Sequence, residues 1–191
     1  ALGMAGAQDP EGLLFPDTYH FPGNTPDSEL LRRARMRMQK ILEKEWRQRA
    51  DGLPYNSPYE ALIMASLVEK EASLPEERPL IAGVFVRRLQ KGMPLQADPT
   101  IIYALGDKFD GNIRKPDMAI DSPYNTYLNA GLPPTPIAMP GRDSLYAALH
   151  PDNGNALYFV AKGDGAHHFS DTFTEHQKAV SMYQLGNGGN E

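Results

Sequence analysis

The 191-residue chain has no cysteine, which excludes disulfide bonds, thiolate nucleophiles and thiolate metal ligands. This absence fits an oxidising compartment without requiring one. No stretch approaches the roughly 18 apolar residues that a membrane-spanning helix needs. Acidic residues outnumber basic ones by 24 to 19, for a net charge of −5. That balance argues against a nucleic-acid partner, which favours a basic surface.

The sequence also lacks the motifs that hold common cofactors and metals. It contains no phosphate-cradling glycine loop and no nucleophile elbow. His167 and His168 are adjacent, so in a strand they would point to opposite faces. The other three histidines have no neighbouring ligands in the sequence. We therefore expect neither a metal nor a cofactor.

The segment from Ser57 to Leu74 predicts a buried helix. Ser57 occupies the N-cap position, Pro58 the first helical position, and Glu60 would complete a capping box. Residues 61–68 are apolar apart from one serine, and a helix that is apolar on nearly every side is buried on nearly every side. A glutamate at the end of such a helix has surroundings that raise a carboxyl pKa and make it a proton donor.

Two glutamates, Glu69 and Glu71, stand at the end of this apolar run. Two helical positions are about 200° apart, so the pair cannot share a site. Glu71 follows a wholly apolar stripe, whereas Glu69 follows a smaller and slightly polar one. These stripes barely separate the two residues. Either one would also fit a surface carboxylate paired with Lys70 or Arg78.

A long helix is predicted from Thr25-Pro26 to about Asp51-Gly52. The residues with core-facing spacing are Leu30, Leu31, Ala34, Met38, Ile41, Leu42 and Trp46. The opposite face carries a basic cluster, made of Arg32, Arg33, Arg35, Arg37, Lys40, Lys44, Arg47 and Arg49. Such a face fits an anionic partner, such as a membrane surface or acidic peptide stems, or simply a solvated helix.

The rest of the chain indicates an α+β fold that is rich in helices and has one small antiparallel hairpin. We expect helices over 80–89, 98–105 and 144–149, a final helix capped by Thr172, and strands over 157–160 and 166–170. Residues 107–140 are punctuated by proline and glycine and predict surface loops. One folded domain should span 11–185, between a flexible lead over 1–10 and a flexible tail over 186–191.

Short motifs spread over almost the whole chain resemble, in their order and spacing, those of one known family. These motifs are Glu11-Gly12, Pro16-Asp17-Thr18-Tyr19, Ala65-Ser66-Leu67-Val68-Glu69-Lys70-Glu71, Glu77-Arg78, Leu95-Gln96-Ala97-Asp98-Pro99-Thr100, Tyr124-Asn125-Thr126-Tyr127, Gly131-Leu132-Pro133-Pro134 and Leu157-Tyr158-Phe159-Val160. The family is that of the YceG-like endolytic murein transglycosylases. The resemblance implies that 11–185 is a catalytic domain.

The resemblance implies a lyase that cleaves the MurNAc–GlcNAc bond of nascent peptidoglycan strands and leaves 1,6-anhydro-MurNAc ends. In that family the second glutamate of the Glu-Lys-Glu run is catalytic, which is Glu71 in this sequence. Its carboxyl group would first protonate the leaving glycosidic oxygen. As a carboxylate it would then take a proton from the sugar's C6 hydroxyl, which attacks the anomeric carbon. The nucleophile is tethered to the substrate, so no protein nucleophile is required.

Amides, hydroxyls and aromatic rings in the matched motifs are candidates for binding the glycan, because they suit sugar hydroxyls, N-acetyl groups and pyranose faces. These substrate-binding candidates are Gln96, Asp98, Thr100, Tyr124, Asn125 and Tyr127. Each has a structural alternative: Asp98 would also fit a helix N-cap, and residues 124–127 a strand with alternate core positions. His168 is a further candidate for the cleft, or a structural histidine.

Two other functions stay open beside the transglycosylase. Asp98 offers a second carboxylate, which a peptidoglycan hydrolase would use together with Glu71. A non-catalytic wall-binding scaffold would keep the fold without needing the acid.

The resemblance also implies where the domain works and what it meets. Its partners would be peptidoglycan glycan strands and cell-wall synthases. The domain would face the periplasm or extracytoplasmic space, held at the inner membrane only through an N-terminal anchor that this chain lacks. For Glu71 itself, we expect a raised pKa, because apolar turns precede it and the negative end of the helix dipole opposes its charge.

Overall fold

A computed structural model describes residues 10–185, so the segments predicted to be flexible, 1–10 and 186–191, lie outside the described residues apart from Pro10. The elements in chain order are α1 (Asp27–Arg47), α2 (Pro58–Glu71), η1 (Pro75–Glu77), α3 (Arg78–Gln90), α4 (Asp98–Leu105), η2 (Gly106–Lys108), η3 (Asp117–Ala119), α5 (Arg142–Leu149), β1 (Tyr158–Ala161), β2 (His167–Ser170), α6 (Phe173–Val180) and η4 (Ser181–Leu185). Helices dominate beside one two-stranded antiparallel sheet, which confirms the predicted α+β class.

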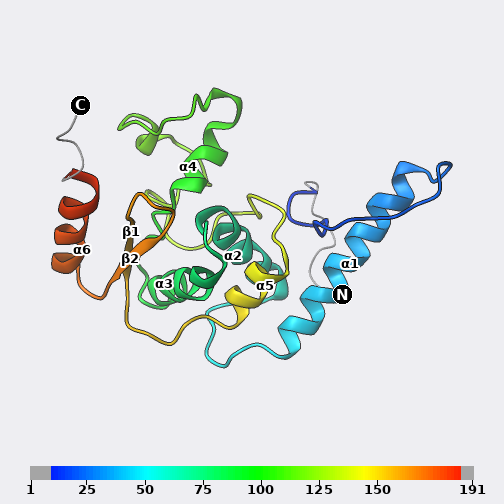
Figure 1. The fold of residues 1–191 in the computed structure, drawn as a ribbon, viewed down its shortest axis with the longest axis horizontal. Coiled ribbons are helices and arrows are strands. Elements are labelled where there is room, and N and C mark those ends of the chain that lie inside the picture. The colour runs from blue at the N-terminus through cyan, green and yellow to red at the C-terminus, as the bar shows by residue number, and fades with distance from the viewer. Residues whose placement is uncertain (1–9, 186–191) are drawn as a thin grey trace.

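Helix α2 lies at the centre of the molecule, where it contacts α1, α3, α4 and α5 (Figure 1). Every residue from 61 to 68 is buried, as its apolar pattern predicts. Ser66, the polar residue in this run, is fully buried because its hydroxyl is satisfied: it donates to the Ile63 carbonyl at 2.7 Å and accepts from the Ile137 N–H at 3.0 Å. The serine thereby ties the end of the long loop to the central helix.

Both ends of α2 differ from the prediction in detail. The Ser57 hydroxyl accepts from the Glu60 N–H at 3.3 Å, but the Glu60 carboxylate accepts from the Asn56 N–H at 2.8 Å instead of closing the capping box on Ser57. The helix ends at Glu71, three residues before the predicted Leu74. Leu74 precedes a proline, which disfavours helical backbone, and it is extended with φ −100° and ψ 128°.

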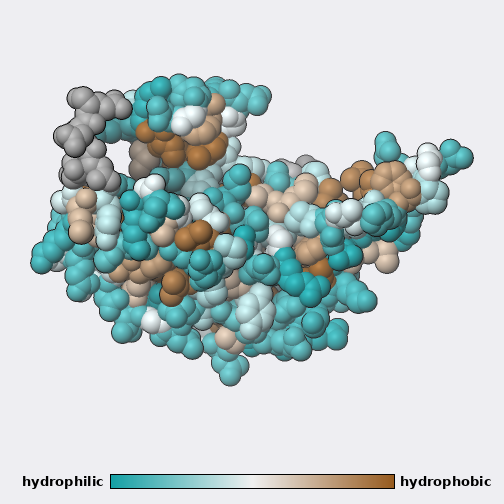
Figure 2. Space-filling view, in the orientation of Figure 1, coloured by the Kyte–Doolittle hydropathy of each residue, from teal (hydrophilic) through white to brown (hydrophobic). Residues whose placement is uncertain are grey.

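Helix α1 is shorter than predicted and its first half projects from the body of the molecule (Figure 1). It begins at Asp27 and ends at Arg47, since the Ala50 N–H donates to the Leu149 carbonyl at 2.9 Å and the chain there follows α5. Leu31 was predicted to face the core but is 53% exposed, whereas Ala34 on the same helix is buried and its carbonyl accepts from the Phe15 N–H at 3.2 Å. Figure 2 shows apolar side chains on the surface of this arm.

The segments around α2 follow the predicted order with small shifts. Helix α3 is followed by Gly92 at φ +66°, the left-handed conformation expected just past a helix end. Helix α4 begins at Asp98, but its N-cap is Ala97 and no side chain caps it. The predicted role of Asp98 as an N-cap is therefore wrong. Residues 107–140 form loops that carry only short 3₁₀ turns, as predicted.

The hairpin and α6 close one side of the fold. Tyr158 pairs with Ser170 and Ala161 with His167, and the turn between the strands uses Gly163 and Gly165 at φ +92° and +87°. Helix α6 starts with a complete capping box between Thr172 and Glu175. It packs against both strands, so hairpin and helix form one unit beside α3.

Within residues 10–185, no helix combines the length and apolar character that crossing a membrane requires. No three His, Cys, Asp or Glu side chains of that part of the chain are grouped to hold a metal ion.

Candidate active site

A cleft of about 380 Å³ opens between the end of α2, the segment before α4, the hairpin and α6. It brings together four of the predicted site residues, which are Glu71, Gln96, Asp98 and Tyr127. It also contains residues that the sequence did not indicate as site residues, among them Arg88, Phe159, His167 and His176. Its walls come from segments more than a hundred residues apart in the sequence, so sequence spacing alone does not predict the full set.

Glu71 has the surroundings of a proton donor. One of its carboxylate oxygens, Oε2, is buried and has no hydrogen-bond partner among the described residues. Burial, and to a lesser extent the negative charge of Asp98, raise the pKa of Glu71 to about 7. The direction agrees with the expectation from the apolar turns of α2. The contribution of Asp98 does not follow from the sequence, because it depends on how α2 and α4 pack together in the fold.

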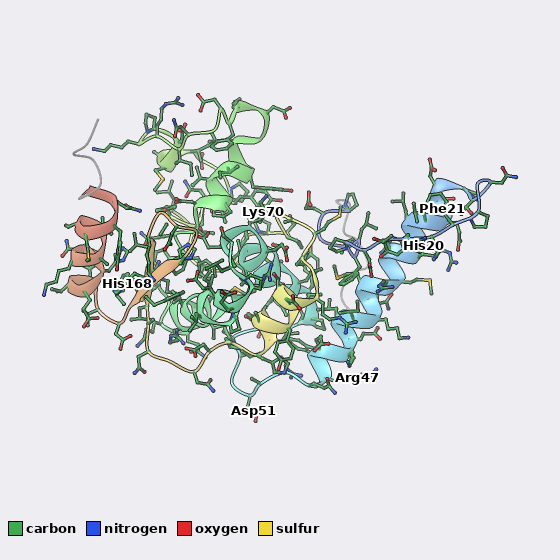
Figure 3. All side chains as sticks on the ribbon, in the orientation of Figure 1. His20, Phe21, Arg47, Asp51, Lys70 and His168 are labelled. Carbon is green, nitrogen blue, oxygen red and sulfur yellow. The ribbon has the colours of Figure 1, made fainter. Side chains whose placement is uncertain are left out.

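The structure shows which of the two glutamates lines the cleft, a distinction that the apolar stripes in the sequence barely make. The Glu69 Oε2 atom accepts a hydrogen bond from the Gly141 N–H at 2.9 Å, and Gly141 is the N-cap residue of α5. Glu69 thus holds the start of another helix and points away from the cleft. Lys70 is exposed at the end of α2 nearest α4 (Figure 3).

Asp98 and Tyr127 are joined across the mouth of the cleft. The Tyr127 hydroxyl donates a short hydrogen bond to Oδ1 of Asp98. Burial, this hydrogen bond and the charges of Asp98 and Glu71 all raise the pKa of Tyr127, so its hydroxyl keeps its proton. Asp98 is therefore a carboxylate acceptor that is oriented by a tyrosine and lies close enough to Glu71 to affect its pKa.

Gln96 is held in an unusual backbone conformation at the edge of the cleft. Its φ of +54° makes it the one non-glycine residue with positive φ in the described part of the chain. Its N–H donates to the Thr126 carbonyl at 3.1 Å, and its side-chain oxygen accepts from the buried Arg88 at 3.1 Å. Arg88 also donates to the carbonyls of Pro94 and Leu95. These bonds fix a strained residue, a feature that is enriched at functional sites.

Asn125, one of the predicted glycan-binding residues, lies in the protein interior. It is fully buried, its amide donates to the carbonyls of Met118 and Ile120 at 3.1 and 2.9 Å, and its oxygen accepts from the Tyr127 N–H at 3.0 Å. Its side chain is therefore engaged in holding the loop that presents Tyr127. Residues 124–127 form turns and not a strand, so the alternative of alternate core positions in a strand is wrong.

Thr100 and Tyr124 are also outside the cleft. The buried Thr100 hydroxyl lies 2.9 Å from the Thr126 hydroxyl and donates to the Ala97 carbonyl at 2.7 Å. The Tyr124 ring packs against Tyr103 with centroids 4.8 Å apart, and its hydroxyl lies 2.8 Å from that of Thr135. Thr100 thus supports the backbone at the start of α4, whereas Tyr124 packs against residues outside the cleft.

The two adjacent histidines point in opposite directions, as their alternation in a strand predicts. His167 lines the cleft, where its N–H and Nδ1 lie 2.9 and 2.7 Å from the two carboxylate oxygens of Glu77. His168, which was the sequence candidate for the cleft, instead faces the ring of Tyr183 at 5.6 Å (Figure 3). The matched Glu77-Arg78 motif marked Glu77 in the sequence, but no motif marked His167.

A larger groove of about 1030 Å³ runs along α1 and contains none of the predicted site residues. Its lining includes most of the basic face predicted for this helix, together with Arg142. Three of those cations have ion pairs on or beside the helix, namely Arg32 with Glu29, Arg37 with Asp17 and Lys44 with Glu45. The smaller cleft, in contrast, contains the carboxyl group of Glu71 with its raised pKa and is the candidate site.

Comparisons with known proteins identify the family of the chain. Residues 2–182 match the profile of the YceG-like family. The chain is 45% identical to an endolytic murein transglycosylase of Bacillus subtilis (strain 168) over 175 residues, which cover 91% of this chain and 48% of that protein. It is 38% identical to an endolytic murein transglycosylase of Streptococcus pneumoniae serotype 2 (strain D39) over 180 residues, covering 91% and 32%.

A solved structure shares the fold as well. A crystal structure of a yceG-like protein from Listeria monocytogenes matches with a TM-score of 0.75 and 38% identity, covering 89% of this chain and 55% of that one. The chain thus spans about half or less of the length of these relatives. The family match extends over nearly the whole sequence, and the chain belongs to the YceG-like family.

Proposed function

We propose that this domain is an endolytic murein lytic transglycosylase that cleaves the MurNAc–GlcNAc bond of nascent peptidoglycan strands and leaves 1,6-anhydro-MurNAc ends. The observation that carries the proposal is Glu71, a carboxyl group in the cleft whose pKa is raised to about 7. A carboxyl group with such a pKa is protonated often enough near neutral pH to donate and can then accept a proton in the next step. The Bacillus subtilis and Streptococcus pneumoniae relatives are named as endolytic murein transglycosylases, which supports the proposal.

In the first step, the Glu71 carboxyl gives its proton to the glycosidic oxygen, and the bond from that oxygen to the anomeric carbon of MurNAc breaks. In the second step, the C6 hydroxyl of the same sugar attacks the anomeric carbon, and its proton passes to the Glu71 carboxylate. The products are a 1,6-anhydro end and a free hydroxyl on the released GlcNAc, with the acid regenerated. Gln96 and Tyr127 line the cleft as hydrogen-bonding groups for the sugars.

A hydrolase is the second candidate, and Asp98 is the observation that favours it. Its carboxylate lines the same cleft as Glu71 and is oriented by Tyr127. A second carboxylate able to activate water would yield a reducing end instead of an anhydro end. The two functions share the acid Glu71 and differ in what attacks the anomeric carbon.

Mass spectrometry of the products from purified uncrosslinked glycan tests the proposal. Anhydro ends support the transglycosylase, reducing ends support the hydrolase, and no cleavage supports a wall-binding scaffold. Glu71→Gln should abolish cleavage while the protein stays folded, since glutamine is nearly isosteric but has no carboxylic proton. Glu69→Gln is the matched control and should cleave at close to the wild-type rate, because Glu69 bonds to Gly141 outside the cleft.

For the cellular setting, we infer an extracytoplasmic domain that works on strands as cell-wall synthases make them. The membrane anchor would belong to a part of the protein that precedes this domain. Protease digestion of intact spheroplasts checks the first part of this inference, because only a domain outside the cytoplasmic membrane would be digested. Cross-linking in growing cells would identify a synthase partner.

A further inference from the structure

A second carboxylate, Glu77, lies behind the cleft and holds one of its wall residues. Glu77 is 7% exposed, and both of its oxygens face the same residue of β2. Oε1 accepts from the His167 N–H at 2.9 Å, and Oε2 lies 2.7 Å from Nδ1 of the His167 ring. The ring is also bounded by Phe159, whose plane is nearly perpendicular to it at 5.3 Å between centroids. The imidazole is therefore fixed in both position and rotation.

This contact determines where the ring proton of neutral His167 resides. An ionised carboxylate only accepts hydrogen bonds, so Nδ1 must be the donor in the bond to Glu77. In the neutral ring the other nitrogen, Nε2, then keeps its lone pair and is an acceptor. Nε2 has no hydrogen-bond partner among the described residues, and the residue lines the cleft that holds Glu71.

We propose that His167 binds the glycan in this cleft by accepting, at Nε2, a hydrogen bond from a sugar hydroxyl or an acetamido N–H, and that Glu77 is the positioning residue that fixes the required tautomer. The proposal rests on the glycan-cleaving function proposed above and adds a contact on the wall opposite α2. Glu71 supplies the proton, while His167 on the hairpin holds the sugar. No proton transfer is assigned to His167.

If the Glu77–His167 pair were purely structural, its role would be to connect β2 to η1. The hydrogen bond from the backbone N–H of His167 to Glu77 already makes that connection. The additional ring contact orients Nε2, which a tie alone would not require. The two roles differ in a measurable way. A structural histidine would not respond to glycan, whereas a contact residue should show a change at Nε2 when glycan binds.

The test is ¹⁵N NMR of the histidine ring in the full chain. To prevent cleavage, Glu71→Gln protein is titrated with a purified GlcNAc–MurNAc tetrasaccharide. We expect His167 to be protonated at Nδ1 before addition, and its Nε2 resonance to shift on binding together with the Gln96 amide. A hydrogen on Nε2 in the free protein would overturn the proposal. So would a shift of Gln96 without any at His167, which leaves the proposed function standing, whereas no shift in the cleft would contradict both.

Glu77→Gln gives an independent readout in otherwise wild-type protein. The glutamine oxygen can still accept from the His167 N–H, but its NH₂ group would donate to Nδ1 and move the ring hydrogen to Nε2. We expect KM to rise about tenfold with a smaller change in kcat, together with the tautomer switch in the NMR spectrum. An unchanged KM alongside a switched tautomer would overturn the proposal.

His168→Gln is the matched control for both experiments. It changes the neighbouring imidazole, which faces Tyr183 on the other side of the strand, and should leave KM and the His167 resonances unaltered. If Glu77→Gln does not fold, the titration of the Glu71→Gln protein still decides between the two roles.

Discussion

At the scale of single residues, Glu71 shows how far the sequence predicts chemistry. The apolar run of α2 predicts a desolvated carboxyl at its end, and the pKa is raised as that pattern indicates. The neighbouring charge of Asp98 could not be predicted, because the contact joins the end of α2 to the start of α4. For the same reason the Glu77–His167 pair could not be predicted, since the matched motifs include Glu77 but not His167.

The raised pKa of Glu71 predicts a pH limb in the reaction. The free enzyme needs a protonated acid for the first step, and the folded-state pKa is about 7. We therefore expect kcat/KM to fall as pH rises through about 7, approaching about tenfold per pH unit above it. Asp98→Asn should move this limb to lower pH, since the charge of Asp98 helps to raise the pKa. Activity that increases through pH 7 would contradict the assignment of Glu71 as the acid.

For Asn125, the structure predicts an effect on stability, whereas the sequence alone suggested an effect on glycan binding. Its amide is bonded to three backbone groups in the interior. We expect Asn125→Ala to lower the free energy of unfolding by about 1–3 kcal/mol for each group left unpaired, as measured by urea denaturation. Tyr127→Phe, which removes one hydroxyl in the cleft, should cost less stability and more affinity for glycan. The reverse pattern would make Asn125 the glycan ligand.

At the scale of elements, local sequence rules predicted most helices and the hairpin. They failed where the end of a helix or the burial of its face depends on packing against another element. The Gly92 helix end, the Thr172 capping box and the glycine turn of the hairpin follow from local chemistry. The exposed Leu31 and the early end of α1 do not, because they depend on which other element lies alongside. Spacing predicts which face of a helix is apolar, but not whether a partner covers it.

Ser66 gives a test at this scale, because it joins α2 to the loop that ends near Ile137. Replacing it with alanine leaves the Ile137 N–H without a partner in the core. We expect Ser66→Ala to reduce the free energy of unfolding by about 1–3 kcal/mol, and to speed hydrogen exchange at Ile137 in particular. A variant that is as stable as wild type, with Ile137 still protected, would show that the loop is held by other contacts.

At the scale of the whole molecule, the cleft forms only when separate segments fold together. Its walls are the end of α2, the strained segment before α4, and the hairpin. Arg88 links the last two walls, because it donates hydrogen bonds to Gln96 before α4 and to the Leu157 carbonyl next to β1. Burying a carboxyl group away from water in such a cleft lowers the free energy of unfolding at any pH where the group would be ionised in the unfolded chain. The function proposed for the domain should therefore lower its stability at neutral pH.

This cost can be measured through the pH dependence of unfolding. The ordinary pKa of 4.5 applies to Glu71 in the unfolded chain, and the folded value is about 7. Between these values the folded protein keeps a proton that the unfolded chain has lost, so the contribution of Glu71 is fully present below about pH 4.5 and is lost as pH rises through 7. The difference between the two pKa values corresponds to about 3 kcal/mol.

Glu71→Gln removes this titration, because glutamine is neutral at every pH. We expect the variant to gain stability relative to wild type as pH rises from 4 to 8, by about 3 kcal/mol in urea denaturation, while it loses cleavage. Glu69→Gln should show no such gain, because Glu69 bonds to the start of α5 outside the cleft. A wild-type protein whose stability relative to Glu71→Gln does not change with pH would mean that Glu71 titrates as an exposed glutamate, and single-acid catalysis at this position would lose its physical basis.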